Sequence, residues 1–297
     1  MNYYKRKRLI GDAMIAIPMI LIGLITIYPF LNVLAVSFND STDTIRGGLT
    51  IFPREVTLRN YIKVLTQYDT LPQAALISVL RTVIGTVLNV IFTSMVAFTL
   101  SRQDFMAREF VNKMFVVTMY VSGGMIPSYI LIKSLGLYGN FWVYIIPGLV
   151  WAFCIFIVRT YIEGLPISLQ ESAMIDGASD ITIYAKIIMP LCKPSIATVA
   201  LYYAVNHWNS WFDTYLYCIR KEKLYTLQFM LQKILQSAQA SENTIKTMKQ
   251  ANRLSSLVTP LSIQMAITVL VVIPIIILYP FLQKYFIKGM TLGAVKG

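Results

Sequence analysis

Side chains suited to binding a polyhydroxylated ligand gather between residues 206 and 215. Hydrogen-bonding groups are offered by Asn206, Asn209 and Asp213, and aromatic rings by Trp208, Trp211, Phe212 and Tyr215. The aromatic residues are spaced i, i+3, i+4 and i+7, so they would share one face of a continuous helix. Aromatic planes beside amides and carboxylates match the C–H faces and hydroxyls of a sugar. An aromatic belt at a membrane interface, or simple helix packing, explains the same residues, and both interpretations stay open.

Two further polar residues lie within the apolar stretch 74–100. Arg81 either lines a path through the membrane or extends its side chain to the lipid headgroups. Asn89 either faces such a path or joins two helices by hydrogen bonds. Polar groups at lipid depth are costly and usually face a cavity or a partner helix. The candidate path residues are therefore Arg81, Asn89, Asn206, Trp208, Asn209, Trp211, Phe212 and Asp213.

Catalysis and metal binding are not indicated by the residue types. His207 is the only histidine, which excludes a His-rich metal site, and we expect it to be a hydrogen-bonded packing residue. Cys154, Cys192 and Cys218 are widely spaced and predict small, buried apolar side chains without disulfides. The chain has no Gly-rich phosphate loop that ends in Gly-Lys-Ser/Thr. We expect no catalytic residue, no metal and no cofactor in this chain.

The composition places these residues in a membrane protein. Hydrophobic residues make up 56% of the 297 residues and charged residues 13%, against roughly 25% charged in soluble domains. The net charge of +12 does not predict nucleic-acid binding, because the basic residues lie at the ends of apolar runs rather than among aromatic ones. They are better explained as anchors to anionic lipid headgroups.

Apolar stretches long enough to cross a bilayer recur along the chain and predict an all-α polytopic membrane protein with six transmembrane helices. The predicted spans are residues 10–38, 74–100, 111–132, 141–162, 195–219 and 261–287. The first is too long for a cleavable signal and lacks a small-residue cleavage site. The third should bend, because it contains Ser122-Gly123-Gly124 and Pro127.

Basic residues set the expected orientation. Lys5-Arg6-Lys7-Arg8 places the N-terminus, residues 1–9, in the cytoplasm. Six crossings then put the remaining inner basic residues on the same side: Arg102, Arg108, Lys113, Arg159, Lys186, Lys193, Lys284 and Lys288. The C-terminal tail, residues 288–297, is also predicted to be cytoplasmic, which gives a multi-pass membrane protein with both ends inside. The basic outer segment 220–259 opposes this orientation, but long loops are translocated despite such charge.

Three connecting segments are longer than simple connections require. Residues 39–73 and 220–259 are predicted outside, and 163–194 inside. Apolar residues at helical spacing in 223–240 predict an amphipathic helix in the last outer loop. Surface of this kind suits docking of another protein.

The inner segment 163–194 is predicted to form a helix–turn–helix. Ser168 and Glu171 have the spacing of a capping box, and Gly177 can adopt the left-handed conformation that ends a helix. Ser179 or Asp180 can cap a second helix over residues 181–189, which should stop at Pro190. The expected apolar contact face comprises Met174, Ile175, Ile181, Ile183 and Tyr184.

This segment resembles the cytoplasmic loop of ABC importer permeases, E-A-A-x-x-x-G followed by I-x-L-P. The matching residues are Glu171, Ser172, Ala173, Asp176, Gly177, Ala178, Ser179, Ile187, Met189 and Pro190. Ser172 and Met189 depart from the pattern, conservatively in size or apolarity. The resemblance to the carbohydrate-uptake branch, and to its maltose-type second permease, extends to other stretches. These are Ser122-Gly123-Gly124 with Ile126-Pro127, residues 207–212 and the tail from Lys288 to Gly297.

The resemblance implies a division of labour among several chains. In such importers the loop sits in a groove of a separate ATPase, present in two copies, which binds ATP and Mg. An extracytoplasmic solute-binding protein delivers the sugar, and a second, homologous permease completes the membrane channel. Glu171 would cap its own helix, contact the ATPase, or do both, and Gly177 would make the turn that aims the second helix. The C-terminal tail would reach between the ATPase subunits or be a disordered end.

Two other classes of function compete with this interpretation. An ABC permease for a polyamine or amino acid would carry the same loop. A secondary transporter would need paired interrupted spans or buried acidic residues for ion coupling, which the sequence does not indicate, and a receptor would not need the inner helix–turn–helix.

Overall fold

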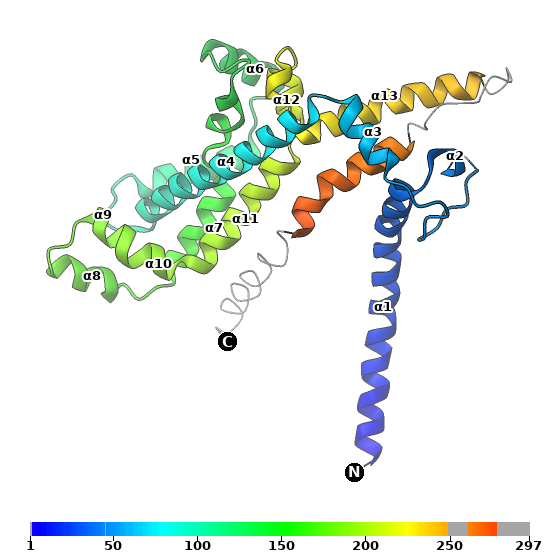
Figure 1. Ribbon diagram of the computed structural model, residues 1–297. Coiled ribbons are helices and arrows are strands. Elements are labelled where there is room, and N and C mark those ends of the chain that lie inside the picture. Colours follow the sequence, from blue (N-terminus) through cyan, green and yellow to red (C-terminus); the bar gives the residue numbers. More distant parts are fainter. Residues whose placement is uncertain (1, 45, 249–260, 278–297) are drawn as a thin grey trace. The chain divides into compact units, whose positions relative to one another are not determined.

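The computed structural model describes residues 2–44, 46–248 and 261–277. These residues are almost entirely helical, and β pairing among them is limited to one isolated antiparallel bridge between Asn39 and Val56. The chain divides into two compact units, which we describe separately. Unit 1 comprises residues 1–69 with 231–273, and unit 2 comprises residues 70–230 with 274–297. The helical class predicted from the sequence is confirmed (Figure 1).

Within the described residues, two helices are long and apolar enough to cross a membrane alone. In α1 (Asn2–Phe38), none of the most apolar 18-residue window is buried within the protein, although Pro18 and Pro29 lie inside the helix. A helix that is apolar all round needs lipid or other protein around it. In α4 (Leu71–Ser101), by contrast, 39% of the corresponding window is buried. These helices match the first two predicted spans.

The third and fourth predicted spans are each interrupted. The bend predicted around Gly124 is present: α5 (Arg108–Tyr120) and α6 (Met125–Ser134) meet at 119°, and Gly124 has a φ of +86°. The fourth consists of η1 (Phe141–Tyr144), η2 (Ile146–Gly148) and α7 (Ala152–Glu163), with a bend of 50°.

The predicted fifth span, residues 195–219, is interrupted between α11 (Lys193–Asn209) and α12 (Phe212–Tyr217). The third bent pair that is long and apolar enough for one crossing is Asp180–Leu191 with α11, which meet at 84°. Of the last span, the described part forms a helix over Leu261–Ile277. By length and composition the described residues hold two spans, or up to five if each bent pair crosses once.

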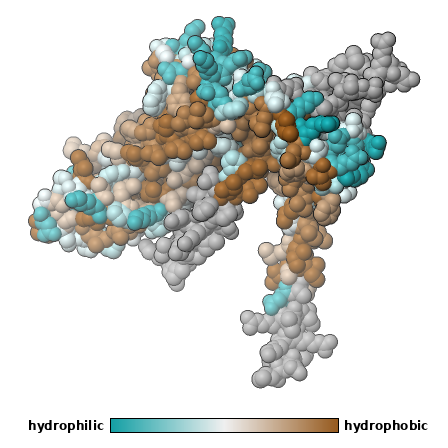
Figure 2. All heavy atoms as spheres, viewed as in Figure 1, coloured by the Kyte–Doolittle hydropathy of each residue, from teal (hydrophilic) through white to brown (hydrophobic). Residues whose placement is uncertain are grey.

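Unit 2 is built around α4, which packs against α7 and α11. Its core contains all three cysteines, which are free and buried as the sequence predicts. The connection between α7 and α11, which carries α8 (Ser168–Ile175), α9 (Asp180–Thr182) and α10 (Met189–Leu191), lies at one end of the unit. The other end carries α6 and α12 (Figure 1). The surface of α4 and α11 between the two ends is mainly hydrophobic (Figure 2).

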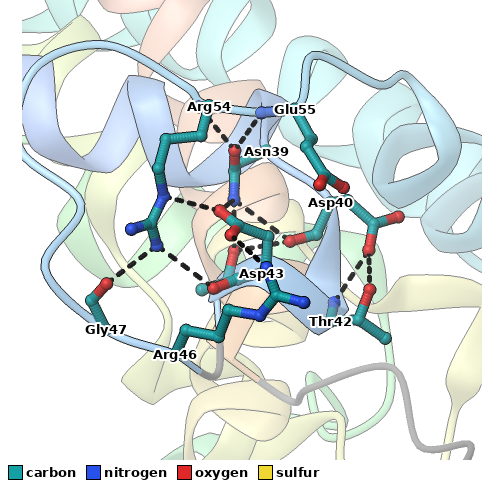
Figure 3. A network of polar contacts seen from close by, with 9 residues as sticks. Asn39, Asp40, Thr42, Asp43, Arg46, Gly47, Arg54 and Glu55 are labelled. Atoms are coloured by element: carbon teal, nitrogen blue, oxygen red, sulfur yellow. Dashed lines mark hydrogen bonds and ion pairs between the residues drawn. The ribbon is translucent and has the colours of Figure 1, made fainter.

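Unit 1 contains a compact polar cluster after α1 (Figure 3). Asn39 is fully buried; its amide donates to the carboxylate of Asp43 at 3.0 Å, and its Oδ1 accepts the backbone N–H groups of Arg54 and Glu55. Arg54 also pairs with Asp43 at 2.8 Å. The hydrogen bond from Asn39, followed by the pairing with Arg54, lowers the pKa of Asp43.

This cluster orders the segment between α2 (Ser41–Thr44) and α3 (Arg59–Gln67). The predicted helix in the last outer segment is also confirmed: α13 covers Leu227–Met248, and Thr226 Oγ1 accepts a hydrogen bond from the Phe229 N–H near its start. The predicted tail, residues 288–297, lies outside the described residues, as do Lys284 and the end of the last predicted span.

Candidate functional site

The turn at Gly177 forms as the sequence predicts. Its φ is +76°, the left-handed region that suits glycine. The Gly177 N–H donates to Met174 O at 3.0 Å and the Ala178 N–H donates to Ala173 O at 2.9 Å. This pair of bonds is a Schellman motif, which ends α8 and reverses the chain toward α9.

The predicted capping box at the start of α8 is wrong. The residue in the N-cap position is Ile167, Ser168 is already inside the helix, and no side chain caps it. Backbone bonds from Gln170 and Glu171 to Ile167 O close the first turn instead. Pro166 immediately before explains the shift, because its fixed φ lets the helical turn begin earlier. The Glu171 side chain is thereby left exposed to contact another molecule.

The second helix of the loop differs from its prediction in geometry. Ser179, rather than Asp180, is its cap, with Oγ accepting the Thr182 N–H at 3.4 Å. The segment η3 (Ile183–Ile188) is a π-helix, a rare form often found at functional sites. Pro190 does not end the helix as expected. It falls at the start of α10, where its missing N–H is not needed, and the chain bends by 84° only after Leu191.

The apolar residues of this loop face two ways. Ile175 and Ile181 are 87% and 79% exposed, and Met174 is also exposed. Ile183 is fully buried in the core of unit 2, and Tyr184 packs on Phe98 of α4 at 5.6 Å between ring centroids. The predicted single contact face is therefore corrected: three of its residues face outward, and two attach the loop to the helices behind it.

Among the other resemblance residues, Ser172, Asp176, Ser179 and Pro190 are exposed, whereas Ala173 is buried. Ala178, Ile187 and Met189 are half-buried. The Tyr184 hydroxyl also shares a 2.7 Å hydrogen bond with Ser94 of α4. Displacement of the loop would therefore exert a force on α4 through both apolar and polar contacts.

Arg102, at the C-terminal end of α4, adds an ionic contact to the loop. Its guanidinium lies 3.3 Å from Asp180 and 2.7 Å from Asp104. The hydrogen bond from Arg102 lowers the pKa of Asp104. The loop, Arg102 and the nearby Glu163, which pairs with Arg108 and Arg159, border a cavity of about 610 Å³. The sequence identified Arg102 only as an inner basic residue, since nothing in its spacing indicates the partner 78 positions away.

The polar side chains on α4 satisfy backbone groups where neighbouring helices are interrupted. Asn89 Nδ2 donates to Gly148 O at 2.6 Å, at the interruption of the fourth span. Thr93 bonds to the Tyr203 hydroxyl, which accepts the Trp151 N–H at 3.0 Å. Non-helical backbone at membrane depth persists only where such groups are satisfied. For Asn89, of the two sequence-based interpretations, the structure shows the interhelical one.

Arg81 likewise satisfies a backbone carbonyl, at the interruption of the predicted fifth span. It is 2% exposed, forms a bidentate ion pair with Asp213, and donates from Nη1 to Ser210 O at 3.1 Å. Its guanidinium carbon lies 4.6 Å from the centroid of the Tyr144 ring. Neither the expected path-lining position nor the extension toward headgroups is observed, because Asp213 provides a buried partner.

The shared aromatic face predicted for residues 208–215 is wrong, because the helix stops at Asn209. Trp208 is buried, while Trp211, Phe212 and Tyr215 form a separate cluster with ring centroids 5.6 to 6.3 Å apart. Asn206 and Asn209 are exposed on α11. His207 is a packing residue as expected, with Nε2 3.3 Å from Asn89 Oδ1.

Known proteins resemble this chain over nearly its whole length. It is 35% identical to the polygalacturonan/rhamnogalacturonan transport system permease protein YtcP of Bacillus subtilis over 291 residues, which cover 98% of this chain and 100% of that protein. It is 31% identical to the arabinooligosaccharides transport system permease protein AraQ of Halalkalibacterium halodurans, with 93% of each covered.

A solved structure agrees with these relatives. One chain of a bacterial ABC transporter involved in the import of the acidic polysaccharide alginate superimposes with a TM-score of 0.83 and 28% identity. The match covers 95% of this chain and 98% of that one. No family model matches the sequence.

Proposed function

The chain belongs to the permease subunits of sugar ABC transporters, and from this premise we propose that it imports an oligosaccharide by converting movement of its inner loop into movement of α4. As a permease subunit it is a transport component rather than a catalyst. The relatives' names specify polysaccharides or oligosaccharides of different kinds. These names favour a sugar over a polyamine or an amino acid.

One observation carries the coupling proposal: the two-sided loop around Gly177. Ile175 and Ile181 offer an exposed apolar surface to a partner, while Ile183 is fixed in the core with Phe98. A rigid segment attached in this way transmits a push as a displacement of whole helices. The partner would be an ATPase subunit, two copies of which bind the ATP and Mg that this chain does not.

The remaining parts of the proposal concern the assembly. We place six spans in the inner membrane of a bacterium, with residues 1–9 and 288–297 in the cytoplasm and the segments 39–73 and 220–259 outside. A second, homologous permease would complete the channel, with lipid around the rest. The ordered cluster around Asn39 supports docking of an extracytoplasmic binding protein on unit 1.

Reconstitution tests the transport function. Liposomes that contain this chain, its partner permease and the ATPase should take up labelled oligosaccharide only when ATP is on the cytoplasmic side of the permease and the binding protein is on the opposite side. A panel of oligogalacturonides, arabinooligosaccharides and spermidine distinguishes the classes. Uptake of spermidine alone, or uptake by this chain unaided, would refute the proposal.

A surface substitution tests the coupling step. Ile175→Glu puts a charge on the exposed face of the loop without touching the core and should abolish co-purification of the ATPase. Met106→Glu is the matched control, because Met106 is fully exposed in the neighbouring inner connection. Equal retention of the ATPase by both variants would remove the loop from the interface.

A further inference from the structure

The interruption of the fifth span is held by an exchange of hydrogen-bond partners. In a continuous helix the Ser210 carbonyl would accept the Thr214 N–H. Here that N–H donates to Asp213 Oδ1 at 2.8 Å, and Arg81 Nη1 supplies the bond to Ser210 O. The same guanidinium pairs with Asp213. Arg81 and Asp213 together therefore replace one backbone hydrogen bond and keep α11 and α12 apart.

The guanidinium is fixed in one orientation. Its two terminal nitrogens bond to Asp213 and Ser210, and the Tyr144 ring lies 4.6 Å from the guanidinium carbon. Tyr144 is itself held, since its hydroxyl donates to Leu224 O at 2.7 Å. Lysine has a single nitrogen without the planar fork, and it could not reproduce these contacts.

Exposed polar and aromatic side chains border this interruption. Asn206 and Asn209 are one helical turn apart on α11, and both are exposed. Phe212 and Tyr215 follow on α12 at 45% and 48% exposure. Amides beside aromatic rings bind sugars by pairing hydroxyls with hydrogen-bonding groups and C–H faces with π surfaces. Their relative directions depend on the angle between α11 and α12, which Arg81 holds.

We propose that Arg81 is a positioning residue for sugar selection: through Asp213 and Ser210 it fixes the interruption of the fifth span and so orients Asn206, Asn209 and Phe212 toward the sugar. This rests on the function proposed above. Arg81 itself does not touch the sugar, because it is buried and fully engaged at both terminal nitrogens. Arg81 thus acts on the sugar only through the residues that contact it.

The test measures uptake by the complete transporter in liposomes. Replacing one member of a buried ion pair can prevent folding, whereas replacing both by apolar residues of similar size is often tolerated. Arg81→Met with Asp213→Leu should therefore assemble to within about twofold of the wild type. Its KM for the preferred oligosaccharide should rise by roughly tenfold, and its preference between two sugars should shrink, because the contact residues lose their fixed geometry.

A second variant allows the test to be made even if the double variant does not assemble. Arg81→Lys keeps the positive charge, so the complex should form, but it cannot bridge Asp213 and Ser210, and KM should rise by about threefold or more. Asn209→Ala should raise KM alone, and its effect should not add to that of the double variant. The control Lys113→Gln removes an exposed pair with Glu109 and should leave KM unchanged.

The outcomes are distinct. An unchanged KM and sugar preference in Arg81→Lys, or in an assembled double variant, would overturn the positioning role and leave Arg81 purely structural. Failure of the wild-type complex to transport any sugar would instead refute the proposed function. A raised KM with unaltered assembly supports the proposal.

Discussion

The two ends of unit 2 hold irregular backbone in place by opposite means. At the end that carries α8 and α9, the turn between these helices has a positive-φ glycine and two backbone hydrogen bonds, and apolar side chains such as Ile183 attach it to the core. At the interruption of the predicted fifth span, a buried ion pair and a hydrogen bond from a side chain to Ser210 O hold the backbone in place.

The difference follows from the surroundings of each segment. A turn that projects into water can leave polar groups to the solvent and needs burial of apolar side chains to stay attached. At the break between α11 and α12 the polar groups lie beside the buried Arg81, and buried N–H and C=O groups must meet protein partners. Apolar packing is therefore enough at the first place, and polar side chains from α4 are required at the second.

The largest expected effect is at the turn. Gly177→Val places a β-branched residue at a φ of +76°, which is strained by roughly 1–3 kcal/mol, and redirects the second half of the loop. Uptake and substrate-stimulated ATP hydrolysis should be lost while membrane insertion is retained. Gly136→Val is the matched control, since Gly136 has a φ of +70° with open space around it. Equal loss in both variants would mean that strain alone, and not the coupling turn, matters.

Packing between α4 and α11 should give the next largest effect. A Cβ on Gly85 would lie 2.5 to 2.8 Å from the His207 ring, and overpacking of this kind typically costs about 1–3 kcal/mol. Gly85→Ala should lower the yield and the unfolding temperature of the purified complex. Gly23→Ala, with nothing within 4 Å, serves as control. Adding His207→Ala to Gly85→Ala should restore the yield and the unfolding temperature, and failure to do so would argue against the contact.

The ion pairs of Arg102 near the loop should matter less than the buried pair of Arg81 with Asp213. Arg102→Gln removes partly exposed pairs with Asp180 and Asp104, which at such sites contribute about 0–1 kcal/mol. Uptake per ATP hydrolysed should fall no more than about threefold. A loss as complete as that of Gly177→Val would show that the loop depends on charge as well as on apolar attachment.

The smallest effect is a dependence on pH. Arg102 lowers the pKa of Asp104 in the folded protein, so this carboxylate stabilises the fold above its unfolded pKa of about 3.9 and ceases to do so as the pH falls through its lower folded value. The unfolding temperature of Asp104→Asn should lie only slightly below that of the wild type at pH 7. The difference should shrink as the pH falls below about 3.9 and disappear once it is below the lowered pKa of the folded protein, and a difference that grows in acid would contradict the assignment.

Much of the loop between α7 and α11 could be predicted from neighbouring residues. Gly177 and Ser179 act on residues three or four positions away. The predicted turn at Gly177 is confirmed, and of the two predicted caps, Ser179 and Asp180, the structure shows Ser179. The predicted cap at Ser168 is wrong, because Ile167, directly after Pro166, takes the N-cap position. The sequence does not predict the π-helical turn of η3, a rare form, whose Ile183 and Ile188 are buried in the same core as Phe98 of α4.

The candidate path residues show where local reasoning fails. Trp208 and Trp211 share a face only if the helix is continuous, and the break between Asn209 and Phe212 is stabilised by Arg81 from 129 positions away. Without that partner in view, the spacing predicts one helix. The sequence likewise does not indicate that Asn89 bonds to the Gly148 carbonyl or Thr93 to the Tyr203 hydroxyl.

The sequence by itself determined the helical membrane class, the resemblance to sugar ABC permeases and the turn at Gly177, because hydropathy, motif spacing and glycine conformation act locally. Only the tertiary structure decided which face of the loop is exposed, and that Arg81 pairs with Asp213. The physical reason is that a buried polar group in a membrane protein is defined by its partner, and that partner comes from a distant part of the chain.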